Sequence, residues 1–202
     1  RVRLDTIDAP RFGVGGAQAD TFALFRGLVS ADLHLNSAVR VYGELGLHRD
    51  IGKGEAPAIT DRDGLDAQVL FVDVTPAKHW RLRLGRQELS FNPTQRFVSV
   101  REGPNIRQSF DGARLTYADK GLKVDAFYTH PIALEPGGFN DSHNASQAFW
   151  GVYATAPVGK AASLDVYSLN LDRDRVRFGA VTGDERRRGV GARLAGKTGA
   201  FD

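Results

Sequence analysis

The sequence has no cysteine among its 202 residues. It can therefore form no disulfide framework, no thiolate metal site and no intermediate on a cysteine nucleophile. Methionine is absent as well, so no start residue is present. The first residues also lack the charged and then apolar pattern of a signal segment. These absences exclude thiol chemistry and leave the cellular compartment open.

Long apolar runs are missing too. A membrane-spanning helix needs about 20 predominantly apolar residues. The longest stretch without a charge lies between Asp141 and Lys160, and it carries Ser, His, Asn, Gln, Gly and Pro. The sequence therefore argues against a helical membrane protein, but not against a membrane protein built from strands.

Charge of one sign is not strongly in excess. The net charge is +3, the sequence pI is about 9.3, and charged residues make up 25% of the chain. The excess is spread along the chain and favours an anionic partner only weakly. We expect no nucleic-acid partner.

Helical periodicity is almost absent, and alternation takes its place. In "AVRVYGELGLHRD" (38–50) the apolar residues fall on one parity and the charged or polar ones on the other. Successive side chains of a strand point to opposite faces, so such a segment has one apolar and one polar face. The same alternation recurs along the chain and predicts about ten strands. They are expected near 1–7, 20–35, 38–50, 64–74, 79–90, 107–118, 121–131, 146–156, 161–171 and 186–196.

The lengths of the strands and of their connections are informative. Most predicted strands have about 11 residues, as a tilted bilayer-crossing strand requires, whereas soluble strands average about 5–6. Long polar loops at 8–19, 51–63, 91–106, 132–145 and 172–185 alternate with short turns. Outer-membrane barrels have this asymmetry. We therefore predict an all-β fold, a transmembrane antiparallel up-and-down β-barrel. A soluble antiparallel sandwich or lipocalin-like barrel is the alternative.

One strand changes parity. In "HWRLRLGRQELSF" (79–91) the apolar residues are even-numbered before Gly85 and odd-numbered after it. A bulge at Gly85 would turn Arg83 inward below it and Arg86 and Glu88 inward above it. The alternative is a regular strand that runs past the apolar band.

Two stretches carry a resemblance to a known family. "RLRLGRQEL" (81–89), followed by "SFDGARL" (109–115), resembles the alginate-export family of outer-membrane barrels. "VRVYGELGLHRD" (39–50), "LDVYSLNLDRD" (164–174) and "RRRGVGARLAG" (186–196) are similar to further strands of that family. The resemblance covers nearly the whole chain.

The resemblance implies a bacterial outer-membrane channel rather than an enzyme. Such barrels have about eighteen strands, so we expect residues 1–202 to be one partial barrel domain that continues beyond both ends. The implied cargo is an anionic polysaccharide, or other anionic or small polar solutes, moving passively through an arginine-lined pore. Outer-membrane lipid and periplasmic export proteins are the other implied partners. A barrel with a non-transport role, such as an enzyme or adhesin, stays open.

Alternation selects the side chains that would line the pore. A uronic-acid polymer carries one negative charge per sugar, and a pore for it needs cations together with some carboxylates so that the polymer does not stick. Arginine suits carboxylates because its planar fork binds two oxygens at once. Asp32 is one further inward-parity carboxylate. The candidate pore-lining residues are Arg26, Arg40, Glu44, Arg83, Arg86, Glu88, Arg114, Lys123, Asp125 and Arg193. Each could instead pair across strands to hold the wall.

Other motifs are weaker. "GARLAGKT" (191–198) fits a phosphate-binding loop, but "DERRRGV" before it could not be a buried strand, and its end is expected to form a short turn. "DRDG" (61–64) and "LDRD" (171–174) lack the full ligand spacing of a calcium loop. The sequence predicts no catalytic residue, no metal site and no cofactor.

Overall fold

The computed structural model describes residues 1–8, 18–54, 58–91 and 97–196. These residues form one antiparallel sheet of 11 strands, and they contain no helix. In particular, they contain no helix long and apolar enough to cross a membrane. The strands are β1 (Val2–Ile7), β2 (Asp20–His34), β3 (Val39–Ile51), β4 (Asp63–Ala77), β5 (Trp80–Gln87), β6 (Phe110–Asp119), β7 (Leu122–Ala133), β8 (Ser142–His143), β9 (Gln147–Val158), β10 (Ala162–Phe178) and β11 (Val181–Gly196).

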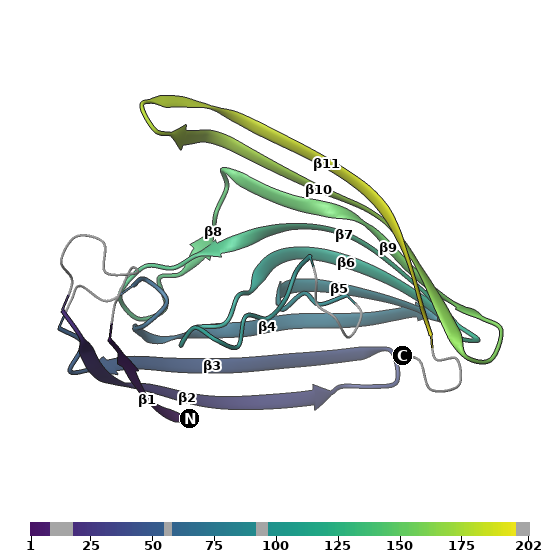
Figure 1. Ribbon diagram of the computed structural model, residues 1–202. Coiled ribbons are helices and arrows are strands. Elements are labelled where there is room, and N and C mark those ends of the chain that lie inside the picture. The colour runs from purple at the N-terminus through teal and green to yellow at the C-terminus, as the bar shows by residue number, and fades with distance from the viewer. Residues whose placement is uncertain (9–17, 55–57, 92–96, 197–202) are drawn as a thin grey trace.

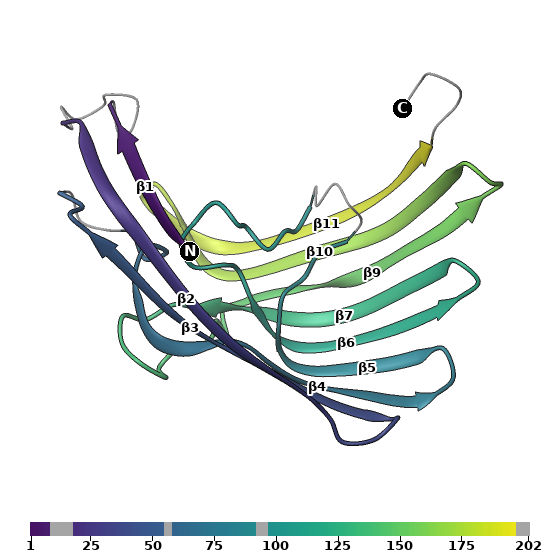
Figure 2. The same ribbon diagram turned by 90° about the horizontal axis from the view of Figure 1, so that it is seen from below.

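Neighbouring strands along the chain are neighbours in the sheet. The order is β1-β2-β3-β4-β5-β6-β7-β9-β10-β11, and the short β8 pairs only with β7. This is the predicted antiparallel up-and-down topology. The sheet is strongly curved and open, with β1 and β11 as its edges (Figures 1 and 2).

The short turns of β2–β3, β4–β5, β6–β7 and β9–β10 lie at one end of the sheet. The other end carries the longer connections, together with the short turn between β10 and β11 (Figure 1). At the turn between β2 and β3, Asn36 Oδ1 accepts hydrogen bonds from the amides of Ala38 and Val39 at 2.8 and 2.9 Å. Between β6 and β7, Lys120 and Gly121 both have positive φ, as a tight hairpin turn requires. We call the two ends the turn end and the loop end.

One predicted long loop is wrong. Residues 172–185 are not a loop, because β10 runs on to Phe178 and β11 begins at Val181. The polar composition of this stretch is explained by cross-strand pairs of opposite charge, including Arg173 beside Glu185 and Asp172 beside Arg186. Such pairs stabilise a strand ladder without any apolar side chain.

The predicted bulge at Gly85 is also wrong. Gly85 pairs with Phe71 of β4 and Gly112 of β6, and the register continues without a shift on both sides of it. The parity change therefore marks the end of the strand at Gln87 rather than a change of face within it. Glu88 lies beyond β5.

The two faces of the sheet differ in chemistry. Large apolar side chains are exposed on the convex face, as shown by Val29, Leu70, Val166, Val190 and Leu194. Val190 is 85% exposed. Val29 and Leu33 share one parity on β2, and Val190 and Leu194 share one parity on β11, as the alternation predicts.

The buried apolar cluster lies on the concave face. It consists of Leu89, Phe91, Phe110, Phe127 and Tyr153, with Phe149 and Tyr167 packed against it. Leu89 and Phe91 precede residues 97–109, which lie in the hollow of the curved sheet (Figure 2). We call residues 88–91 and 97–109 the inner segment. Its packing against the sheet makes the core.

The stretch that matched a phosphate-binding loop is mostly strand. Residues 191–196 belong to β11 and pair with β10. A phosphate loop instead requires a tight turn that opens a helix. Lys197 and Thr198, with the turn expected there, lie outside the described residues.

Candidate functional site

The charged parity of the strands faces the hollow. Arg107 of the inner segment forms an ion pair with Glu44 of β3, and Phe91 stacks on Tyr153 of β9 with ring centroids 5.1 Å apart. Because the inner segment lies in the hollow (Figure 2), side chains on the pleat of Glu44 and Tyr153 point into it.

A row of ionised side chains crosses this concave face from β2 to β11, and we call it the ionic row. Cross-strand register connects it, since Arg40 stands beside Asp73, Asp73 beside Arg83, and Arg83 beside Arg114. Further along, Asp165 stands beside Arg193. The cations of the ionic row are Arg40, Arg81, Arg83, Arg114, Lys123 and Arg193, and its carboxylates are Asp32, Asp73, Asp125 and Asp165. Positive charge is therefore in excess.

Asp73 joins three strands of the ionic row. Arg83 donates to both of its carboxylate oxygens, at 2.7 and 2.8 Å. Arg40 donates to it at 3.2 Å and also donates to Asp32 at 2.7 and 2.9 Å. Arg83 further lies over the Phe71 ring, 3.5 Å from its centroid. These contacts hold both guanidinium groups in fixed positions.

Asp125 has the same role on β6 and β7. Arg114 donates to it from Nε at 2.9 Å and pairs with it through Nη2 at 2.9 Å. Thr116 donates its hydroxyl to Asp125 at 2.6 Å, and the Lys123 ammonium lies 3.4 Å away. Lys123 is half-exposed, so its charge remains available to the hollow. On β10, Asp165 accepts from Thr155 at 2.8 Å and pairs with Arg193 at 3.4 Å.

Three other predicted residues anchor the inner segment. Arg26 is buried and donates to the carbonyls of Asn105 and Pro104 at 2.6 and 2.7 Å. It also pairs with Glu102 at 2.8 Å. Arg107 contacts Glu44 of β3 and lies 2.8 Å from Glu88. Arg26 and Glu44 therefore connect β2 and β3 to the inner segment, and Glu88 contacts Arg107 within that segment.

The inner segment contains a perturbed carboxyl group. Burial raises the pKa of Glu88 to about 7. Arg107 opposes that increase, whereas the nearby carboxylates of Glu44 and Glu102 add to it. The pKa of Glu102 is lowered instead, mainly because Arg26 donates a hydrogen bond to it.

Arg86 does not share the face of Arg83. It stands beside Leu70 of β4 and Asp111 of β6, on the pleat that carries the apolar side chains. Its guanidinium donates to Asp111 at 3.0 and 3.2 Å and to the carbonyls of Ala67 and Asp141 at 2.9 and 3.1 Å. The predicted inward position depended on the bulge at Gly85, which the register excludes.

Several residues of the concave face were not predicted from sequence. Asp73 and Asp165 each lie between two apolar residues, so alternation could have found them. Arg107 belongs to a loop, where alternation gives no direction. The stacked rings of Tyr153 and Tyr167, 5.4 Å apart and inclined by 6°, also needed the register to be recognised.

Comparison with known families and proteins gave one positive result. A search of curated proteins found no match to the chain. The sequence profile described as alginate export matches residues 1–202. The match spans every strand of the sheet and agrees with the all-β architecture. The chain therefore belongs to the alginate export family.

Proposed function

We propose that this sheet is part of the wall of a closed outer-membrane β-barrel through which an anionic polysaccharide moves passively. Membership of the alginate export family indicates an outer-membrane export channel and a polysaccharide substrate, and the family is one of transport proteins rather than enzymes. The barrel closure, the charge of the pore and the passive mechanism are the proposal.

The ionic row is the observation that carries this proposal. Its cations outnumber its carboxylates, and its members lie on β2 to β7, β10 and β11, on the pleat that faces the hollow. A polyanion that leaves bulk water needs such charges along its path. The paired carboxylates hold the arginines in place and limit the net positive charge, so that the polymer is attracted without being trapped.

The convex face supports a position in lipid. Exposed apolar side chains such as Val29, Val166 and Leu194 lie on the pleat opposite to the ionic row. Near the loop end the side chains on this pleat are polar. There Trp150 donates its indole N–H to Asp172 at 2.8 Å. An indole at such a boundary suits the interface between hydrocarbon and water. The apolar band would contact the acyl chains.

The experiment is conductance of the full-length protein in planar bilayers, with oligouronates as blockers. Oligouronates are expected to reduce the current at concentrations where neutral oligosaccharides of equal length do not. Arg83→Gln should weaken this block by about tenfold or more, since one charged hydrogen-bonding partner contributes about 1.5–3 kcal/mol and each 1.4 kcal/mol is about tenfold. Arg188→Gln, which removes a charge near Trp150 on the other face, is the matched control. Equal block by neutral and anionic sugars would refute the proposal.

A further inference from the structure

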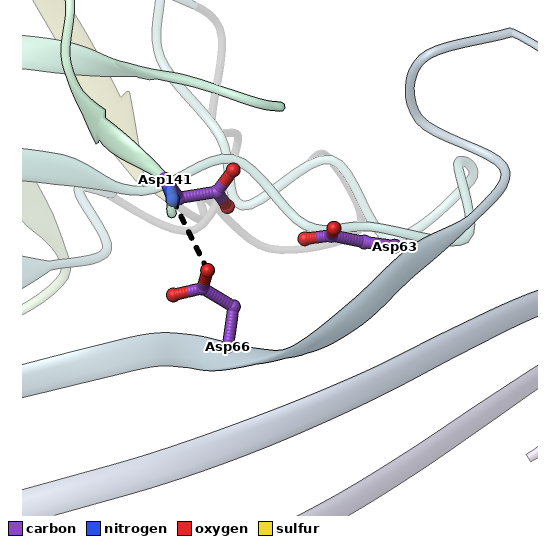
Figure 3. A group of neighbouring side chains, drawn as sticks. All are labelled: Asp63, Asp66 and Asp141. Atoms are coloured by element: carbon purple, nitrogen blue, oxygen red, sulfur yellow. Dashed lines mark hydrogen bonds between the residues drawn. The ribbon is translucent and has the colours of Figure 1, made fainter. Parts of the chain in front are cut away.

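Three aspartates from two distant segments meet at the loop end of the sheet (Figure 3). Asp63 and Asp66 belong to β4, and Asp141 precedes β8. One carboxylate oxygen of each lies within 4.8 Å of those of the other two. Asp63 is 5% exposed and Asp66 is 7% exposed. Their side chains converge on one buried point.

The three carboxylates of this cluster have fewer cations beside them than negative charges. Arg86 Nη1 lies 3.6 Å from Asp66, but the same guanidinium also pairs with Asp111. Asp63 and Asp141 form no ion pair within the described part of the chain. Backbone amides donate to all three carboxylates, but carboxylates gathered in a mostly buried place are unfavourable unless a proton or a cation joins them.

A second observation points to a bound ligand at the cluster. The three aspartates and His48 line a cavity of about 10 Å³, which is close to the space that one water molecule needs. His48 is 3% exposed, and neither ring nitrogen has a hydrogen-bond partner among the described residues. Its ring lies against Gly46, which stands beside Asp66 in the ladder. Buried imidazole nitrogens are normally paired, so a group that fills the cavity is expected.

We propose that Asp63, Asp66 and Asp141 bind one Ca²⁺ ion, with His48 hydrogen-bonded to a water molecule on that ion. Calcium prefers carboxylate, carbonyl and water oxygens and accepts irregular coordination. The ring nitrogens of His48 fall outside the group of carboxylate oxygens, which disfavours a metal that needs a direct imidazole ligand. Sequence spacing could not reveal the whole site, because "DRDG" contains only Asp63 of the three aspartates and Asp141 lies 75 residues after Asp66.

The ion would stabilise the part of β4 that does not pair with β5. The ladder between β4 and β5 reaches only to Leu70 and Arg86, although β4 extends to Asp63. Residues 137–141 take the place of β5 there. Phe139 donates its amide to the Leu65 carbonyl at 3.1 Å, and the amides of Asn140 and Asp141 donate to Asp66 at 2.9 and 3.1 Å. Calcium would fix this segment to β4 and keep the strand edge covered.

The test is calcium titration of the full-length protein in detergent, after removal of divalent ions with a chelator. Calorimetry is expected to show one Ca²⁺ per chain, with a dissociation constant on the order of 10⁻⁴ M, as for weak extracellular sites. Saturation should raise the Tm by about 5 °C. Asp141→Asn should lose both responses. Because this change also removes carboxylate repulsion, the variant without calcium should unfold at a Tm equal to or above that of the wild type.

Asp174→Asn is the matched control, since Asp174 pairs with Arg186 at the same end of the sheet. It should keep the full calcium response. Absence of calcium heat and of a Tm shift in the wild type would overturn the site, and so would a wild-type response in Asp141→Asn. Neither result depends on conductance, so the site and the transport proposal are tested separately.

Discussion

Arg83 donates two parallel hydrogen bonds to Asp73, from Nε at 2.7 Å and from Nη2 at 2.8 Å. Arg40 approaches the same carboxylate from the neighbouring strand at 3.2 Å. One buried carboxylate therefore fixes two cations of the concave face. The charge of the concave face and the stability of the sheet are connected through this residue.

Asp73→Asn tests that connection. The substitution leaves Arg40 and Arg83 without a charged partner on β4, so the free energy of unfolding should fall by about 2–4 kcal/mol. Under the proposed function anion selectivity should increase, because one negative charge leaves the concave face. Denaturant unfolding and reversal potential are the two measurements. Asp32→Asn is the control, since Arg40 keeps Asp73 as a partner, and a loss of stability as large as that of Asp73→Asn would contradict the central role of Asp73.

Arg86→Gln should change stability without changing selectivity. Arg86 is nearly buried and pairs with Asp111 and Asp66, so its loss should cost about 2–4 kcal/mol of unfolding free energy. Its side chain lies on the face opposite to Arg83. The reversal potential should therefore match that of the wild type. A shift equal to that of Arg83→Gln would mean that the face assignment is incorrect.

The inner segment should be held less firmly at alkaline pH. The pKa of Glu88 is about 7 in the folded chain, above its ordinary value of 4.5. Stability that depends on the neutral carboxyl is fully present below about pH 4.5 and is lost as the pH rises through 7. Amides of residues 97–109 should exchange faster at pH 8 than at pH 5.5, after correction for intrinsic exchange rates. Glu88→Gln should remove this difference, and equal protection of the wild type at both pH values would exclude the effect.

Gly85→Ala should destabilise the sheet. Gly85 has a φ of +120°, and an added methyl group would meet the Leu70 carbonyl oxygen. Backbone strain of this kind costs about 1–3 kcal/mol. Gly183→Ala is the control, because no heavy atom lies within 4 Å of the added carbon. Thermal unfolding compares the two, and equal Tm values would show that the wall tolerates a side chain at position 85.

The period of two made most of the sheet predictable. A strand with one apolar face specifies both its direction of burial and its register, which is why Arg40, Arg83 and Arg114 could be placed on one face from sequence. Apolar residues did not reveal the strands where these extend past the exposed apolar side chains of the convex face. Asp172 and Arg186 form a strand pair in a stretch that reads as a polar loop.

The parts that could not be predicted depend on long-range contacts. Arg107 reaches Glu44 from a loop whose path alternation does not specify. The aspartate cluster joins β4 to residues that follow β7, and no local pattern connects them. Arg86 was predicted on the wrong face because Leu89, which lies beyond the end of β5, was interpreted as a change of face within the strand.

The central claim is that the concave face lines an anion-selective pore. Its most direct test is the reversal potential of the full-length protein in a planar bilayer separating high and low KCl. The excess of cations in the ionic row predicts a potential of the sign that chloride permeation gives, reduced in Arg83→Gln and unchanged in Arg188→Gln. A clear preference for potassium in the wild type would contradict the account.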